Sequence, residues 1–416
     1  MTILISGAGI AGLTLGLTLH QIGVPFRIFE RVRQLEPLGV GINLQPHAVR
    51  ELTEMGLASM LDRVGLRTQD YGFYTRTGQQ IWSEPRGAAA GYHWPQFSVH
   101  RGQLQMALAD ALVQRAGPDC IALGHNLSDF QSTPGGVTAN FATSDGPIAT
   151  QGSLLIGADG IHSAVRAQFY PDEGPPVWGG AIMWRGTTLA RPFLSGASMI
   201  LAGNDTQRFV AYPITAPDPR TGFATINWIA EKRVDPASPV AREDWNRAVP
   251  TDAFRGDFDD WRFEWLDIPA LIDGAETVYE YPMVDREPLA RWTFGNATLI
   301  GDAAHATYPV GSSGASQAIV DARILGAAIK TLGPSQAATQ CFEDEVRPKA
   351  NAVTLANRSQ GGPDGIMQMA EDRCGGDFSK LDTALPRPER AAHAARYKAL
   401  AGFSVAEMNA RPSILS

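Results

Sequence analysis

Cysteine is scarce in this sequence of 416 residues. Its three cysteines, Cys120, Cys341 and Cys374, are odd in number, far apart and without a C-x-x-C spacing. This excludes a disulfide framework and disfavours a zinc site or a redox-active pair, so we expect no bound metal. Few, scattered cysteines are typical of a reduced compartment, and we expect a cytoplasmic protein.

Long apolar runs and clusters of positive charge are also missing. No stretch of eighteen or more apolar residues free of charge predicts a membrane span, and the apolar N-terminus lacks the basic residues that begin a signal peptide. The formal net charge is −8 and no basic block is present, which disfavours a nucleic-acid partner. The remaining composition, 44% hydrophobic and 19% charged, is typical of a globular protein with two or three domains.

Residues 2–30 carry the clearest pattern in the chain. They predict a buried strand, a G-x-G-x-x-G turn, an apolar helix and a second strand, in that order. Gly7 permits the tight turn, Gly9 lets a pyrophosphate approach the backbone, and Gly12 lets helix and strand pack closely. Glu30 follows at close to the roughly 20-residue spacing of a ribose-binding acid. A turn that binds nothing fits this order poorly, so the sequence predicts a dinucleotide site.

Two later strand ends repeat this arrangement. Residues 152–156 predict a strand that leads into Asp159-Gly160, where Ser163 is positioned to cap the next helix. Residues 297–300 predict another strand that leads into Gly301-Asp302. A loop with Gly311 and Gly314 then opens a helix over 315–328, whose N–H groups should face an electron-rich group. His305, in that loop, is interpreted as structural.

The middle of the chain has a different composition. Residues 180–188, 198–202, 208–214 and 223–230 are rich in β-branched and aromatic side chains and predict an antiparallel sheet, inserted into the nucleotide-binding unit. Residues 31–46 predict a long loop, and long loops are usually functional. Arg101 stands at a strand-to-helix junction, where a cofactor contact and an ordinary surface position are equally compatible with the spacing.

Together, the G-x-G-x-x-G turn, the Gly157-Ala158-Asp159-Gly160 turn and Gly301-Asp302 resemble the three-part signature of the class A flavoprotein aromatic hydroxylases. The resemblance covers residues 1 to about 350, and within the family it is greatest to the phenazine hydroxylases that make pyocyanin. The local matches are Leu38–Asn43, Trp82–Gly87, His100–Gly102, Met183–Gly186, Tyr281–Arg286 and Gly314–Ile319.

The resemblance implies that the cofactor is a tightly but non-covalently bound FAD. Its pyrophosphate would lie on the first turn, its ribose on Glu30, its adenine near Leu127, and its ring beside Pro309 and the helix that follows. Asp159 would also serve NAD(P)H, a transient co-substrate. The implied cofactor-binding residues are Gly7, Gly9, Ala11, Gly12, Glu30, Arg31, Arg101, Gln105, Leu127, Asp159, Asp302, Gly311, Gly314 and Ala315.

The implied activity is NAD(P)H- and O2-dependent hydroxylation of an aromatic or heteroaromatic carboxylate or phenol, with or without decarboxylation, through a flavin hydroperoxide. The flavin does the chemistry, so no catalytic side chain is assigned. Candidate pocket residues on the inserted sheet are Met183, Trp184, Arg185, Tyr212 and Trp228. Arg185 fits a partner for a substrate carboxylate and a structural salt-bridge partner equally well. The competing functions are a flavin oxidase, reductase or halogenase on the same fold, and a non-catalytic flavin redox sensor.

The expected fold is α/β: a Rossmann-type FAD-binding domain with an inserted antiparallel β-sheet substrate domain and a C-terminal helical region. We expect the cofactor domain at residues 1–175 and 281–345, the substrate domain at 176–280 and the helical region at 346–416. Either a monomer or a homodimer is compatible with the sequence.

Overall fold

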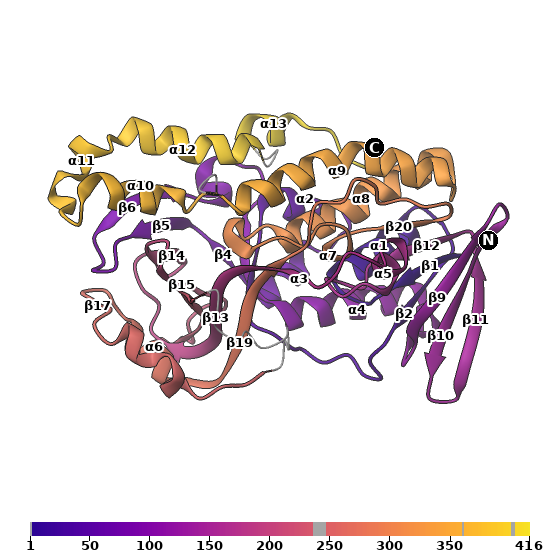
Figure 1. The fold of residues 1–416 in the computed structure, drawn as a ribbon, viewed down its shortest axis with the longest axis horizontal. Helices are drawn as coiled ribbons and strands as arrows, with labels where there is room; N and C mark the ends of the chain where they lie inside the picture. Colours follow the sequence, from indigo (N-terminus) through magenta and orange to yellow (C-terminus); the bar gives the residue numbers. More distant parts are fainter. Residues whose placement is uncertain (1, 236–246, 360–361, 401–403) are drawn as a thin grey trace.

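The computed structural model describes residues 2–235, 247–359, 362–400 and 404–416 (Figure 1). One half is built on a parallel five-stranded sheet in the order β20-β12-β1-β2-β8. Its strands are β1 (Ile3–Ser6), β2 (Phe26–Glu30), β8 (Ile121–Leu123), β12 (Leu154–Gly157) and β20 (Ala297–Leu299). Every residue of β1 and β12 is buried, as expected of parallel strands covered on both faces.

Helices from distant parts of the chain cover this sheet. Helix α1 packs against both α4 and α8, so the first, middle and last thirds of the sequence meet in one core. These helices and their neighbours are α1 (Ile10–Gln21), α2 (Pro46–Glu54), α3 (Ala58–Val64), α4 (Arg101–Ala116), α5 (Ala164–Phe169), α7 (Asp302–His305), α8 (Gly314–Leu332) and α9 (Gln336–Asn357). The strand–turn–helix units expected after residues 2–6, 152–156 and 297–300 are all present.

The other half is a seven-stranded sheet in the order β19-β13-β16-β15-β14-β5-β6. Its strands are β5 (Asp70–Tyr74), β6 (Gln80–Pro85), β13 (Val177–Ala190), β14 (Ser198–Gly203), β15 (Gln207–Pro213), β16 (Ala224–Arg233) and β19 (Ala275–Asp285). The sheet is antiparallel except where β14 pairs parallel with β5. It therefore includes a hairpin from the N-terminal part of the chain, which lies outside the 176–280 segment expected to form it.

Smaller elements frame the two sheets. One three-stranded sheet contains β9 (Asn126–Thr133), β10 (Gly136–Thr143) and β11 (Gly146–Gly152), and another contains β3 (Gly41–Leu44), β4 (Gly65–Thr68) and β7 (Gln96–His100). The prediction of an unbroken loop over 31–46 is wrong at β3. Side chains of the seven-stranded sheet bond the backbone at the start of this strand. Gly41 N donates to Asn227 Oδ1 at 2.6 Å, and Gly41 O accepts from Arg185 at 3.0 Å.

The seven-stranded sheet also has a cap on one side. The cap contains β17 (Arg262–Phe263), β18 (Leu266–Asp267) and α6 (Ile268–Asp273). Buried aromatic side chains fill the space between this cap and the sheet. That face of the sheet is therefore an apolar core.

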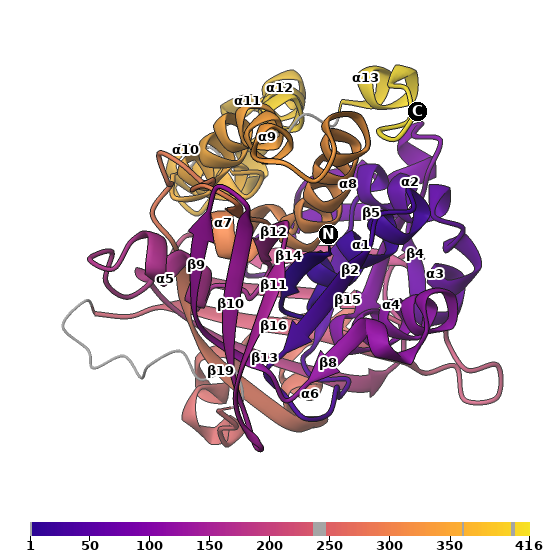
Figure 2. The ribbon, with the colours of Figure 1, turned by 90° about the vertical axis from the view of Figure 1, so that its right-hand side faces the viewer.

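The C-terminal region is helical, as expected, and lies along β5 and β6 (Figures 1 and 2). Its helices are α10 (Gly365–Cys374), α11 (Leu381–Ala384), α12 (Arg387–Leu400) and α13 (Val405–Ala410). Ile366, Met367 and Leu385 from this region are buried with Tyr71 and Phe73 of β5. The tail is thus a packed wall of the sheet half.

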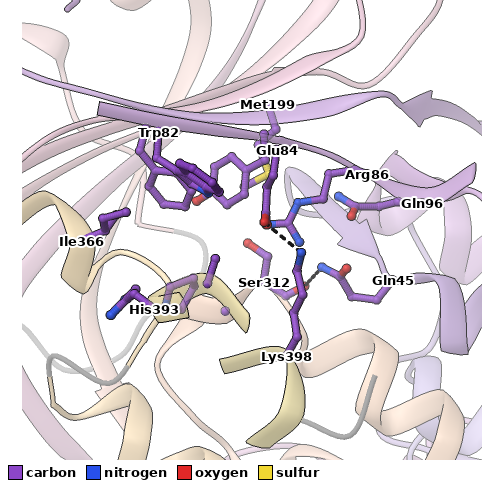
Figure 3. A pocket seen from close by; sticks show the side chains of 15 residues that line it. Gln45, Trp82, Glu84, Arg86, Gln96, Met199, Ser312, Ile366, His393 and Lys398 are labelled. Atoms are coloured by element: carbon purple, nitrogen blue, oxygen red, sulfur yellow. Dashed lines mark hydrogen bonds and ion pairs between the residues drawn. The ribbon is translucent and has the colours of Figure 1, made fainter. Parts of the chain in front are cut away.

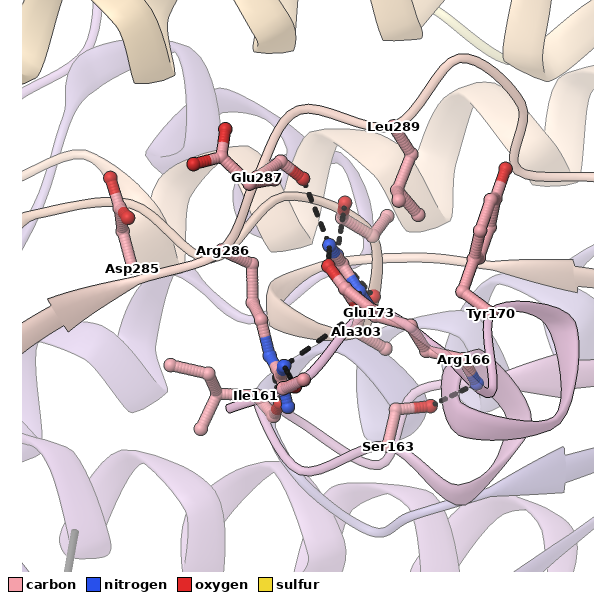
Figure 4. Close-up of polar contacts among 12 residues, drawn as sticks. Ile161, Ser163, Arg166, Tyr170, Glu173, Asp285, Arg286, Glu287, Leu289 and Ala303 are labelled. Atoms are coloured by element: carbon pink, nitrogen blue, oxygen red, sulfur yellow. Dashed lines mark hydrogen bonds and ion pairs between the residues drawn. The ribbon is translucent and has the colours of Figure 1, made fainter. Parts of the chain in front are cut away.

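A buried arginine ties α5, the helix after the Asp159-Gly160 turn, to α7 (Figure 4). Arg166 of α5 donates to Ala304 O at 3.0 Å, to Ala303 O at 3.2 Å and to Glu287 O at 2.9 Å. Its guanidinium also pairs with Glu173, and the arginine side chain is only 1% exposed. These bonds join α5 to two segments that lie more than a hundred residues further along the chain.

Replacing Arg166 with Met should therefore lower the free energy of unfolding by about 3 kcal/mol or more, because it leaves buried carbonyls without their donor and leaves Glu173 with the more distant Arg286, at 3.7 Å, in place of Arg166. Denaturant titration measures this. The matched control is Arg76→Met, which removes an exposed ion pair with Asp260 and should cost less than about 1 kcal/mol. Equal losses in the two variants would contradict the assigned role.

Candidate functional site

A cavity of about 310 Å³ lies between the two halves of the molecule. Its walls come from three distant parts of the chain. The turn after β1 contributes Gly9, Ile10 and Ala11; the start of α7 and the loop before α8 contribute Asp302 and residues 307–310 and 312–315; and the seven-stranded sheet contributes one face. The carboxyl ends of the parallel strands open onto this cavity, which is where ligands bind in such sheets.

The glycines of the first turn have separate structural roles. Gly7 has φ +106°, and a Cβ there would lie 2.5 Å from Ala158 O. A Cβ on Gly12 would lie 2.0 Å from Gly7 O, whereas a Cβ on Gly9 would meet nothing within 4 Å. Gly7 and Gly12 are therefore required by packing, and Gly9 faces open space. Helix α1 begins there with no side-chain cap and no acidic residue in its first turn, so its N–H groups are free for an anion.

Neighbouring side chains hold this turn in place. Glu30 accepts hydrogen bonds from Ala8 N at 2.8 Å and from Val32 N at 3.1 Å. Gln105, on α4, donates to Ala8 O at 2.8 Å. Glu30 and Gln105 thus both hold the turn through the backbone of Ala8. Arg31 is exposed, and Leu127 is buried on β9, away from the cavity.

The second turn presents Ala158 and Gly160 to the cavity, while the Asp159 side chain points to α5. Asp159 Oδ2 accepts from Ala164 N at 2.9 Å, and Ser163 Oγ accepts from Arg166 N at 3.0 Å. The expected capping by Ser163 is confirmed. Burial raises the pKa of Asp159, against hydrogen bonds that lower it. Arg101 lies at the β7–α4 junction and lines the cavity, as does the exposed Asp302.

The loop before α8 forms the opposite wall. Pro309, Ser313, Gly314 and Ala315 line the cavity, and α8 starts at Gly314 without a side-chain cap. Two uncapped helix N-termini, those of α1 and α8, therefore face one space. Ser312 has φ +48°, a left-handed conformation that costs a non-glycine residue about 1–2 kcal/mol. Such strain persists only where neighbours hold it.

Those neighbours are visible on the far side of the loop, around a second cavity of about 20 Å³ that Gly311 and Ser312 also line (Figure 3). Gln45 N donates to Ser316 Oγ at 2.9 Å, and Gln45 Nε2 lies 3.5 Å from Ser312 O. Lys398 of α12 donates to Glu84 at 2.8 Å across the same space. Gln45 thus holds the loop and the start of α8, while α12 is tied to β6 across the cavity.

His305 is bound within the protein. Its Nε2 lies 2.6 Å from Asp321 Oδ2, which also accepts from Gly301 N at 2.9 Å. Its ring packs 5.3 Å from that of Trp292. Burial alone would lower the pKa of His305, but the Asp321 carboxylate outweighs burial and raises it. The geometry agrees with a structural histidine.

The face of the seven-stranded sheet decides which expected pocket residues reach the cavity. Met183, Arg185 and Tyr212 line it. Trp184 and Trp228 do not, and the prediction for these two is not met. Side chains alternate along a strand, so both point to the opposite face. There Trp184 stacks on Phe254 and donates to Glu280 at 2.8 Å, and Trp228 is fully buried.

Arg185 has no carboxylate within ion-pairing distance in the described part of the chain. Its NH2 donates to Gly41 O, and its buried Nε has no partner. Its guanidinium lies 5.9 Å from the Tyr281 ring centre. Burial lowers the pKa of Arg185, whereas the nearby Tyr212 and Tyr281 raise it. The salt-bridge alternative therefore has no support in these residues.

Three charged residues of the cavity were not expected: Arg208, Glu231 and Asp364. Arg208 and Glu231 share the face of Met183 by strand alternation, a signal that the sequence did contain. Asp364 comes from the C-terminal region, where no sequence pattern pointed to the cavity.

The residues present fit FAD. A phosphate group can approach the backbone at Gly9, where no Cβ intervenes, and the free N–H groups of α1 and α8 suit a pyrophosphate and an electron-rich ring edge. In the described ranges, no group of three or more His, Cys, Asp and Glu side chains could hold a metal ion. No described helix is both long and apolar enough to cross a bilayer.

Comparison with known proteins agrees with this geometry. The family model described as "FAD binding domain" matches residues 1–260 and 269–354. The chain belongs to this family. A phenazine 1,6-dicarboxylic acid hydroxylase of Lysobacter antibioticus is 41% identical over 364 residues, which are 86% of this chain and 89% of that protein. A 3-amino-4-hydroxybenzoate 2-monooxygenase of Streptomyces platensis is 31% identical over 91% of this chain and 93% of that protein.

Solved structures share the fold. A Klebsiella pneumoniae HpxO complex with FAD and uric acid has a TM-score of 0.74 at 23% identity, covering 97% of this chain and 96% of that one. A salicylate hydroxylase substrate complex has a TM-score of 0.73 at 20% identity, with 98% and 97% covered. The expected resemblance to class A aromatic hydroxylases is confirmed. The chain is an FAD-dependent aromatic monooxygenase with NAD(P)H as electron donor.

The two glycines of the first turn give a matched test. Gly9→Val should leave the stability of the FAD-free protein nearly unchanged but weaken FAD binding at least tenfold, about 1.4 kcal/mol, by filling the approach to the backbone. Gly12→Ala should destabilise the FAD-free protein itself. Flavin absorbance per chain and thermal unfolding measure both; normal FAD content in Gly9→Val would contradict the assignment.

The His305–Asp321 pair predicts a pH-dependent stability. Because the folded-state pKa of His305 is raised, its contribution is complete below the unfolded value near 6.5 and is lost as pH rises through the folded value. The stability lost in His305→Gln should therefore be larger at pH 6 than at pH 9. Urea titrations at both pH values measure it, and a loss that grows with pH would contradict the pairing.

Proposed function

We propose that this monooxygenase hydroxylates an aromatic or heteroaromatic carboxylate whose carboxylate binds Arg185. The observation that carries the proposal is the state of this side chain. Arg185 lies on the floor of the cavity, half-buried, with a buried, unpartnered Nε and no acidic partner in the described residues. A cation that is partly removed from water without a counter-ion is costly, and a bidentate carboxylate would reduce that cost.

The rest of the cavity suits a planar apolar ring. Met183, Met199, Leu201, Val210 and Ile229 line its floor. These side chains would exclude water from the substrate ring, and exclusion of water favours transfer of oxygen to the substrate over loss of the oxidant to solvent. Arg185 would fix the carboxylated edge of the ring relative to the cofactor, and correct placement of a bound ring is itself a large part of catalysis.

The residues proposed to hold FAD are those expected from the sequence. The N–H groups at Gly9, Ala11 and the start of α1 would bind the pyrophosphate, with Gly7 and Gly12 shaping the turn; Glu30 would bind the ribose. Gly314 and Ala315 would face the ring, beside Pro309 and Gly311. When bound, FAD supplies electron transfer from NAD(P)H and activation of O2. The further proposed contacts are Arg31, Arg101, Gln105, Leu127 and Asp302, with Asp159 serving NAD(P)H.

The cysteines bear on the compartment in which the enzyme works. Cys120, Cys341 and Cys374 are all free thiols, which supports a reducing compartment and a cytoplasmic enzyme. The partners are then the aromatic acid, NAD(P)H and O2, and the working unit is a monomer or a homodimer. The flavin oxidase, reductase, halogenase and redox-sensor alternatives differ in producing no hydroxylated substrate.

Turnover with aromatic acids tests the activity. Phenazine-1-carboxylate is a suitable first substrate, since a relative is named for a phenazine dicarboxylic acid. The product mass should show gain of one oxygen, or loss of CO2 with gain of a hydroxyl group. Consumption of NAD(P)H across a broad panel of aromatic acids without any oxygenated product would contradict a monooxygenase.

Arg185→Met should raise KM for the aromatic acid by about 10- to 100-fold, the value of a charge-assisted hydrogen bond, with a smaller change in kcat. Steady-state kinetics measure both constants. Trp184→Phe is the matched control, because the neighbouring side chain faces the opposite side of the sheet. An unchanged KM in Arg185→Met would contradict carboxylate binding at this residue.

A further inference from the structure

On the floor of the cavity, side chains of neighbouring strands form rows across the sheet, and two adjacent rows each contain one arginine. In the register of the sheet, Met183, Glu231 and Arg208 lie side by side on β13, β16 and β15. Arg185 and Ile229 belong to the next row on the same face. Rows of this kind are about 7 Å apart, because two strand residues separate them. The two arginines therefore stand in different rows of one binding surface.

Each nitrogen of the Arg208 guanidinium already donates to an oxygen of the protein. Its NH2 donates to Asp205 at 2.6 Å, its Nε donates to Asn204 O at 3.0 Å, and its NH1 bonds Asp364. Asp364 is brought there by the C-terminal region, just before α10, and also lines the cavity. Unlike Arg185, Arg208 therefore already has carboxylate partners within the protein.

Glu231 is the one carboxyl of the three around Arg208 that does not hydrogen-bond to it. Its Oε1 lies 3.9 Å from Arg208 NH1, beyond hydrogen-bond distance, and no hydrogen bond reaches it from the described residues. Its side chain is 14% exposed, and it lines the cavity. Burial raises the pKa of Glu231; Arg208 opposes this and Asp364 adds to it. Three carboxyl groups thus surround a single guanidinium.

We propose that Glu231 is a specificity residue that accepts a hydrogen bond from an N–H or O–H group of the substrate, on the part of the ring system away from the carboxylate. This inference rests on the proposed binding of the substrate carboxylate to Arg185. It narrows the substrate class to aromatic acids that carry a ring hydroxyl, an amino group or a protonated ring nitrogen.

The same arrangement disfavours a second carboxylate on the substrate. A dianionic acid would bring a negative group to a cluster that already holds three carboxyls for one arginine. Like charges at close range in a buried site repel strongly. The Glu231 row therefore selects hydrogen-bond donors and rejects diacids.

Binding to the FAD-loaded enzyme tests this with three probes: phenazine-1-carboxylate, its 6-hydroxy derivative and phenazine-1,6-dicarboxylate. The wild-type enzyme should bind the hydroxy acid about tenfold more tightly than the unsubstituted acid, and the diacid about tenfold more weakly. Glu231→Leu should abolish the advantage of the hydroxyl group while leaving the affinity for the unsubstituted acid nearly unchanged. Glu231→Gln should bring the diacid within about threefold of the unsubstituted acid.

Glu280→Gln is the matched control, because Glu280 lies on the same sheet but bonds Trp184 on the opposite face. It should leave all three dissociation constants unchanged. The inference is overturned if Glu231→Leu weakens the three probes equally or changes none, or if the wild type prefers the diacid. Failure of the proposed function looks different: no probe binds the wild type, or Arg185→Met binds phenazine-1-carboxylate normally, and the inference then falls with it.

Discussion

The structure depends on one close backbone approach, between the turn after β1 and the turn after β12. Gly7 sits where a Cβ would lie 2.5 Å from Ala158 O, and Gly12 where a Cβ would lie 2.0 Å from Gly7 O. Because β1 and β12 are parallel neighbours, this contact brings two strand ends to a common edge. The helix that starts at Gly314 faces the same edge. The cofactor site is thus a consequence of how tightly these turns pack.

The second constraint is the alternation of side chains on the seven-stranded sheet. One face is filled by aromatic side chains, including Trp184, Trp228 and Phe254, and is a core. The other face carries Arg185, Glu231 and apolar residues into the cavity. One face of the sheet therefore packs in the protein core, and the other face lines the binding cavity. The C-terminal region adds Asp364 to the wall of the cavity, where it bonds Arg208.

Much of this was readable in the sequence because it is local. The G-x-G-x-x-G turn, the Asp159-Gly160 turn and the start of the helix at Gly314 each depend on a few consecutive residues, and all three were predicted. The errors concern side chains whose position depends on the sheet or on residues far away in the sequence. Trp184 was placed in the pocket by its aromatic character, although alternation from Met183 assigns it to the opposite face. Asp364 had no signal at all, since its contact with Arg208 spans 156 residues. The domain boundaries at 175, 280 and 345 stay a prediction.

A crystal structure of the FAD-loaded enzyme with an aromatic acid that it turns over would test the central claim most directly. The account predicts the pyrophosphate at the N-terminus of α1, the flavin ring against Gly314 and Ala315, and the substrate carboxylate within hydrogen-bond distance of Arg185. A complex in which Arg185 keeps only its bond to Gly41 O while the carboxylate binds elsewhere in the cavity would contradict it.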